Sequence, residues 1–158
     1  MNENKKTAAP MSWVTTWGTA EENFVATPEG MPPPLADTTV RQIVRVTTAG
    51  DEMKLRLSNR YGKSDVTIRS LHAARQIKAD QSTIDLSTDT VVRVSGSEEI
   101  SIPAGKVIET DPFRLSVRAL DNVAITAYFG AAPGTVDEMT GHRGARATTY
   151  QVSGNEVS

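Results

Sequence analysis

The chain has 158 residues, 38% of them hydrophobic, and a formal net charge of −2. This length suffices for one domain with a hydrophobic core, and the near balance of charges gives no reason to expect nucleic acid as a partner. The sequence contains no cysteine, which excludes disulfides, thiolate metal sites and a cysteine nucleophile. No apolar run approaches the roughly 20 residues that a membrane-spanning helix needs, so we expect no membrane partner.

Residues 1–11 are predicted to form a disordered leader, and residues 12–158 a single β-sandwich domain. The leader has basic residues with no apolar stretch after them, so it is not a signal peptide as it stands, and the cellular location stays open. Residues 12–19 are predicted to form a first strand, in which Trp13 and Trp17 lie on one face and pack together. The two rings are interpreted either as core or sheet-edge aromatics or as a platform on which a sugar stacks.

The segment from Val40 to Gly62 is predicted to form a β-hairpin around which the rest of the chain is organised. In its second arm Met53, Leu55 and Leu57 alternate with polar residues, and this period of two places them on one buried face. The first arm is rich in β-branched residues, which suit a pleated surface. Residues 49–51 include a glycine that permits a tight reversal between the arms.

Short strands separated by turn signals are predicted along the rest of the chain. Two long loops, residues 20–39 and 130–145, lie between them, and loops of this length often cover a site. No sustained helical period appears. The pattern therefore predicts an all-β fold, most simply two antiparallel sheets in a jelly-roll-like sandwich. The predicted strands after the hairpin are residues 65–76, 90–95, 98–102, 106–110, 113–118, 123–129 and 147–152.

The sequence contains no recognisable catalytic constellation. His72 lies in a predicted strand and is assigned a structural role, whereas His142 lies in a glycine-containing loop of the kind that more often carries function. His142, Arg143 and Trp17 are the candidate substrate-binding residues. Two histidines without cysteine do not support a transition-metal site, no cofactor is expected, and there is no Gly-x-Ser-x-Gly nucleophile elbow.

Several segments, in a fixed order and spacing, resemble one family. They are residues 13–18 (WVTTWG), 35–45 (LADTTVRQIVR), 57–62 (LSNRYG), 102–105 (IPAG), 110–112 (TDP) and 144–150 (GARATTY). Together they resemble the N-terminal β-sandwich region of bacterial SGNH/GDSL-type esterases, a group that includes acylhydrolases associated with xylan breakdown. The resemblance covers about residues 12–157.

The resemblance implies a role beside a catalytic domain. In that family this region precedes an α/β hydrolase domain whose nucleophilic serine lies in a Gly-Asp-Ser motif, and this chain contains no Gly-Asp-Ser. The expected function is therefore a non-catalytic accessory domain, inactive alone, that docks on an SGNH catalytic domain in the same or a separate chain. The loops at residues 20–39 and 130–145 would shape substrate access.

Two other interpretations remain open. A carbohydrate-binding module would use aromatic side chains to bind a polysaccharide or an acylated glycan, although the chain has only eight aromatic residues and several of them must fill the core. A structural or oligomerising domain would instead pair its exposed sheet edges with those of another chain.

Overall fold

The computed structural model describes residues 12–24, 35–130, 139–142, 144 and 146–158. Within these ranges the chain is built of β-strands and one 3₁₀ turn, and every strand pair is antiparallel, which confirms the all-β prediction. The elements are β1 (Glu22–Phe24), β2 (Thr38–Arg45), β3 (Gly50–Met53), β4 (Arg56–Ser58), β5 (Val66–Ile68), β6 (Ser70–Arg75), η1 (Leu86–Thr88), β7 (Thr90–Val91), β8 (Ile100–Ile102), β9 (Val107–Glu109), β10 (Phe113–Val117), β11 (Asn122–Phe129), β12 (Met139–Gly141) and β13 (Thr149–Ser153).

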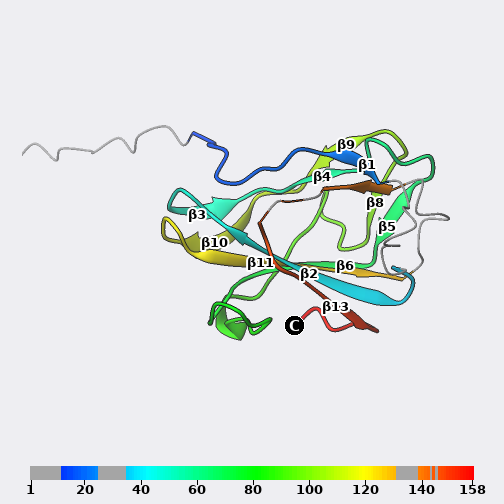
Figure 1. The fold of residues 1–158 in the computed structure, drawn as a ribbon. Coiled ribbons are helices and arrows are strands. Elements are labelled where there is room, and N and C mark those ends of the chain that lie inside the picture. The colour runs from blue at the N-terminus through cyan, green and yellow to red at the C-terminus, as the bar shows by residue number, and fades with distance from the viewer. Residues whose placement is uncertain (1–11, 25–34, 131–138, 143, 145) are drawn as a thin grey trace, which may run out of the picture.

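A five-stranded sheet in the order β13-β2-β11-β6-β7 is the largest unit among the described residues. The other strands pair as two-stranded ribbons, β1-β12, β10-β3, β4-β9 and β5-β8. Figure 1 shows β1, β4 and β9 at the top of the view and β2, β11 and β6 below them, with the core between. The strands β2 and β11 share an eight-residue register, so they form the centre of the large sheet.

The main core fills the space between the inner face of the large sheet and the ribbons. The sheet contributes Val44, Leu71 and Val123, and the ribbons contribute Ile100 and Leu115, all of them buried. Burial of this apolar surface is the main favourable term in folding. The strand predicted at residues 113–118 is present as β10, in which Phe113, Leu115 and Val117 are buried and the residues between them are exposed.

The predicted hairpin of residues 40–62 is wrong. β2 pairs with β11 and β13, whereas β3 pairs with β10 and β4 with β9. The alternation in the second arm was interpreted correctly, because Met53, Leu55 and Leu57 do pack against the main core. They reach that core from the ribbon side, opposite to Val44 in β2, so the two arms belong to different sheets and cannot pair with each other.

The strand predicted for residues 65–76 is divided at Arg69 into β5 and β6. β5 pairs with β8 and β6 with β11, so the chain changes sheets at this point. Ile68 and Leu71 both lie in the main core, although they are three residues apart. A continuous strand places such residues on opposite faces, so the break at Arg69 is what returns the apolar side chains to the core.

The first predicted strand, residues 12–19, is also wrong, because this stretch has no strand pairing and β1 begins only at Glu22. It is attached instead through Thr16, whose hydroxyl accepts a hydrogen bond from the backbone N–H of Thr47 at 2.9 Å. Trp13 is 49% exposed, while Trp17 packs against the main core. The two rings therefore lie in different surroundings. The leader predicted for residues 1–11 lies outside the described residues.

The outer face of the large sheet is covered as well. Ile43, Ala74 and Ala124 form a second buried cluster with Ile84, which comes from the segment leading into η1. The central strand β11 is consequently buried on both faces, as Val123 and Ala124 show. The last residues of the chain also fold over this face. Val157 is buried there, although most of residues 153–158 are polar.

Candidate functional site

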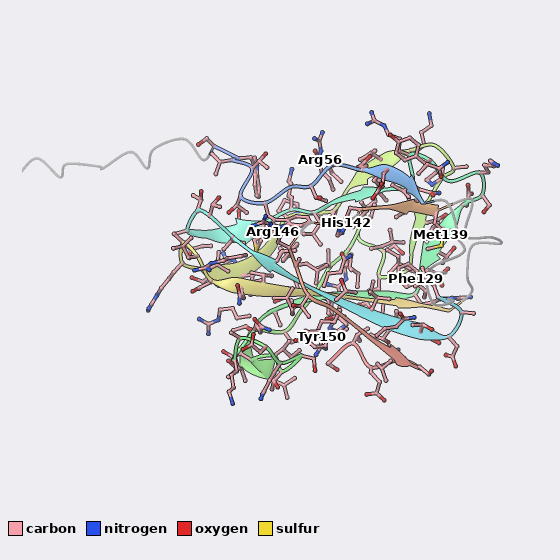
Figure 2. The ribbon with its side chains drawn as sticks, viewed as in Figure 1. Arg56, Phe129, Met139, His142, Arg146 and Tyr150 are labelled. Atoms are coloured by element: carbon pink, nitrogen blue, oxygen red, sulfur yellow. The ribbon has the colours of Figure 1, made fainter. Side chains whose placement is uncertain are left out.

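Two of the three predicted site residues come together in the structure. The rings of Trp17 and His142 are in edge-to-face contact, with centroids 6.1 Å apart and planes at 69°. The side-chain amide nitrogen of Gln42, in β2, lies 3.2 Å from Nε2 of His142. Figure 2 shows His142 between the upper strands and β2. The third predicted residue, Arg143, lies outside the described residues. We call Trp17, Gln42 and His142 the edge cluster.

His142 is positioned by the short ribbon that precedes it. Gly141 pairs with Glu22 in the β1-β12 register, and the hydroxyl of Thr140 accepts a hydrogen bond from the backbone N–H of Tyr61 at 2.9 Å. These contacts attach β12 to both β1 and the turn after β4. A local sequence pattern could not reveal this, because the contacts join residues about 80 to 120 positions apart.

The imidazole of His142 faces an amide in the edge cluster. The side-chain amide of Gln42 engages Nε2 of His142, so this ring nitrogen is not free. A general base that activates a nucleophile needs a free ring nitrogen within hydrogen-bond reach of a hydroxyl. Among the described residues, neither histidine is hydrogen-bonded to a hydroxyl group.

A second polar cluster, on the outer face of the large sheet, was missed at the sequence level. Nδ1 of His72 lies 2.8 Å from Oδ2 of Asp89, and both side chains are largely buried. Thr126, which pairs with His72 across β11 and β6, accepts a hydrogen bond from Nε of Arg41 at 2.8 Å. Burial lowers the pKa of the Arg41 guanidinium, and the Asp89 carboxylate opposes this effect. The structural role predicted for His72 agrees with this packing.

The C-terminal segment is attached to β2 through the Asp-Thr-Thr-Val-Arg stretch. The backbone N–H of Gly154 donates to the carbonyl of Asp37 at 2.7 Å. The hydroxyl of Thr39 donates to the Gly154 carbonyl at 2.6 Å and accepts from the N–H of Glu156 at 2.9 Å. Arg41 Nη2 donates to the carbonyl of Val157 at 3.1 Å. We call these contacts the tail latch.

Tyr128 closes the latch from the neighbouring strand, because its hydroxyl donates to Oδ1 of Asp37 at 2.9 Å. This hydrogen bond to a carboxylate raises the pKa of Tyr128. The described residues hold no group of three histidine, aspartate or glutamate side chains placed to bind a metal ion. No helix in the described ranges is long and apolar enough to cross a membrane.

Comparison with known proteins adds no family assignment, because no family model and no curated protein sequence matches the chain.

Asp85 joins η1 to the end of β6. Its Oδ1 accepts hydrogen bonds from the hydroxyl of Ser87 at 2.6 Å and from the Ser87 N–H at 3.1 Å. Its Oδ2 accepts from Nη2 of Arg75 at 2.8 Å. The hydrogen bond from the Ser87 hydroxyl lowers the pKa of Asp85 below its ordinary value of 3.8. Desolvation opposes this effect, and the hydrogen bond from Arg75 adds to it to a lesser degree.

We expect the η1 segment to loosen in acid. A carboxylate whose pKa is lowered in the folded state stabilises that state above its ordinary pKa, and the stabilisation is lost as pH falls through the lowered value. Amide exchange at Ser87 and Thr88, corrected for intrinsic rates, should therefore accelerate as the pH falls below about 4. In Asp85→Asn the exchange should be fast and independent of pH over this range. A wild-type profile parallel to that of the Asn variant would contradict the prediction.

Proposed function

We propose that the chain is a non-catalytic accessory domain of an SGNH/GDSL-type ester hydrolase, folded as a two-sheet jelly-roll-like sandwich, that docks on the catalytic domain. The observation that carries this proposal is the edge cluster. It joins the N-terminal segment, β2 and the residue after β12 in one half-buried contact, and its histidine is held by an amide rather than by a hydroxyl nucleophile.

The segments that carry the family resemblance also support the proposal, because they contact one another. Nδ2 of Asn59, in the LSNRYG segment, donates to the carbonyl of Ile102, in the IPAG segment, at 3.0 Å. The N–H of Ile43, in the LADTTVRQIVR segment, donates to the carbonyl of Thr148, in the GARATTY segment, at 2.9 Å. The resemblance therefore rests on residues that are joined in space as well as ordered in sequence.

The proposal is tested first on the sequence of the gene and then by a binding experiment. We expect the reading frame, or a neighbouring one, to encode a Gly-Asp-Ser hydrolase domain, which is then produced separately. The present chain should form a complex with it at micromolar concentrations, and Trp17→Ala should weaken that complex, while the matched variant Trp13→Ala should not. The proposal would be overturned if no such reading frame encodes a Gly-Asp-Ser domain, or if the two separately produced chains do not co-elute.

Trp13 favours a second candidate, a carbohydrate-binding module. Its indole is 49% exposed, and Nζ of Lys54 lies 4.8 Å from the ring centroid. A half-exposed indole is the usual stacking surface for a sugar ring, and the ammonium group adds a donor for hydroxyl groups beside it. Retardation in polysaccharide gels that Trp13→Ala abolishes would support this candidate. Equal mobility with and without polysaccharide would exclude it.

A further inference from the structure

A hollow of about 230 Å³ opens where β6 ends, β11 begins and the chain enters η1. None of its lining residues belongs to the edge cluster. The volume is below the about 300–1,000 Å³ typical of sites for drug-sized ligands, so it suits a ligand of roughly one sugar ring. Its lining residues are Arg75, Gln76, Ile77, Asp85, Asp121 and Asn122.

The walls of the hollow are fixed before any ligand arrives. The N–H of Asp85 donates to the Arg75 carbonyl at 2.8 Å, and the N–H of Gln76 donates to the Asn122 carbonyl at 3.0 Å. The side chains of Asn122 and Gln76 are hydrogen-bonded to each other at 2.8 Å. Asp121 is held by the N–H of Arg118, which donates to its Oδ2 at 2.8 Å. Such preorganisation lowers the entropic cost of binding.

The charges that line the hollow select the chemistry of its ligand. Arg75 uses Nη2 for Asp85, and its side chain is 42% exposed, so the guanidinium keeps donors that a ligand can reach. An anion would be attracted to Arg75 but repelled by two carboxylates, those of Asp85 and Asp121. A cation would be attracted to the Asp121 carboxylate, but it could not accept a hydrogen bond from the Arg75 guanidinium. A hydroxyl group both donates and accepts, and it carries no charge.

One aliphatic side chain accompanies these polar groups. Ile77 lines the hollow and is 64% exposed. An exposed aliphatic side chain can pack against the C–H face of a sugar.

We propose that this hollow is a binding site for one unit of a neutral, polyhydroxylated ligand, such as a single sugar ring. Ligand hydroxyls accept hydrogen bonds from the Arg75 guanidinium and donate to the Asp121 carboxylate, while the ring packs against Ile77. The site is separate from the edge cluster and from Trp13, so it stands or falls independently of the function proposed above.

The test is an NMR titration of the full ¹⁵N-labelled chain with D-glucose, and separately with sodium acetate and methylammonium chloride. A single-ring ligand of this kind binds with a Kd of about 1–10 mM, so concentrations up to about 100 mM suffice. We expect glucose to cause saturable shifts at residues 75–77, 85 and 121–122, and the charged probes to cause none. Absence of saturable shifts, or tighter binding of either charged probe, would overturn the proposal.

Variants separate binding from folding. Arg75→Lys keeps the positive charge beside Asp85 but removes the guanidinium donors, and the loss of one hydrogen bond should raise the Kd about fivefold. Arg69→Lys, which changes an exposed arginine paired with Glu99, is the matched control and should leave the Kd unchanged. Ile77→Ser removes the aliphatic contact from the hollow and should also weaken glucose binding. Equal glucose affinity in Arg75→Lys, Ile77→Ser and the wild type would refute the assignment.

Discussion

Asn59→Ala is expected to lower the free energy of unfolding by about 2–4 kcal/mol, an effect typical of breaking a buried hydrogen-bond network. Asn59 is 1% exposed. Its Nδ2 donates to the carbonyls of Ser64 at 2.8 Å and Ile102 at 3.0 Å. The backbone carbonyl of Asn59 accepts hydrogen bonds from the backbone N–H groups of Gly62 and Gly105. Alanine cannot replace the two side-chain bonds, and the Ile102 carbonyl would remain buried without that donor.

Chemical denaturation followed by tryptophan fluorescence measures this loss. Asn155→Ala removes the same amide from an exposed position and is expected to change stability by less than about 0.5 kcal/mol. Equal midpoints for Asn59→Ala and Asn155→Ala would show that the buried amide contributes nothing.

Gly62 provides an internal check on the same turn. A Cβ at this position would lie 1.8 Å from Oδ1 of Asn59, far inside contact distance, so Gly62→Ala must displace the amide and should destabilise the protein by a similar amount. Once Asn59 is alanine, the clash disappears. The two substitutions should therefore be strongly non-additive, with Gly62→Ala costing little in the Asn59→Ala background. Additive losses would mean that the glycine serves some other purpose.

The strands that the sequence predicts well are those with one face in water. β10 is an example, because Phe113, Leu115 and Val117 alternate with exposed residues and the period of two is therefore visible. β2 is different, since Val44 lies in the main core and Ile43 in the cluster on the outer face. Where both faces of a strand are buried, the hydrophobic pattern no longer indicates which face lies against which layer. The prediction that β2 pairs with the next segment in the sequence is wrong for this reason.

The candidate site was predictable only in part, for a related reason. Trp17 and His142 were singled out by residue type and loop position, but their contact with Gln42 depends on a register between distant segments. The polar cluster around His72, on the outer face of the large sheet, also depends on the register between distant segments. Thr126 faces His72 because of the β11–β6 register, and no local pattern in either segment records that pairing. Side-chain identities were available from the sequence, whereas their neighbours were set by strand order.

The second large effect is expected for Arg41→Met, which should lower the free energy of unfolding by about 2–3 kcal/mol. The Arg41 guanidinium donates to the hydroxyl of Thr126, to the carbonyl of Ser82 at 2.7 Å and to the carbonyl of Val157. One side chain thus joins β2 to β11, to the segment before η1 and to the C-terminal segment. Methionine keeps much of the aliphatic volume but supplies no donor.

Arg45→Met is the matched control, because Arg45 lies four residues further along the same strand, faces the same side and is exposed. It should change stability by less than about 0.5 kcal/mol. Hydrogen exchange adds a local readout: in Arg41→Met the N–H of Glu156, which donates to Thr39 in the tail latch, should lose its protection before the β2–β11 ladder does. Simultaneous loss at both places would indicate general destabilisation instead.

Arg41→Lys distinguishes charge from geometry. A planar guanidinium donates in several fixed directions, whereas an ammonium on a flexible stem is a compact point charge that cannot span three acceptors on three segments. We therefore expect Arg41→Lys to retain the favourable interaction with Asp89 yet to lose most of the protection at Glu156. If lysine restored wild-type protection, the C-terminal segment would be held by Thr39 and Asp37 alone, and the contact from Arg41 to Val157 would have no part in the latch.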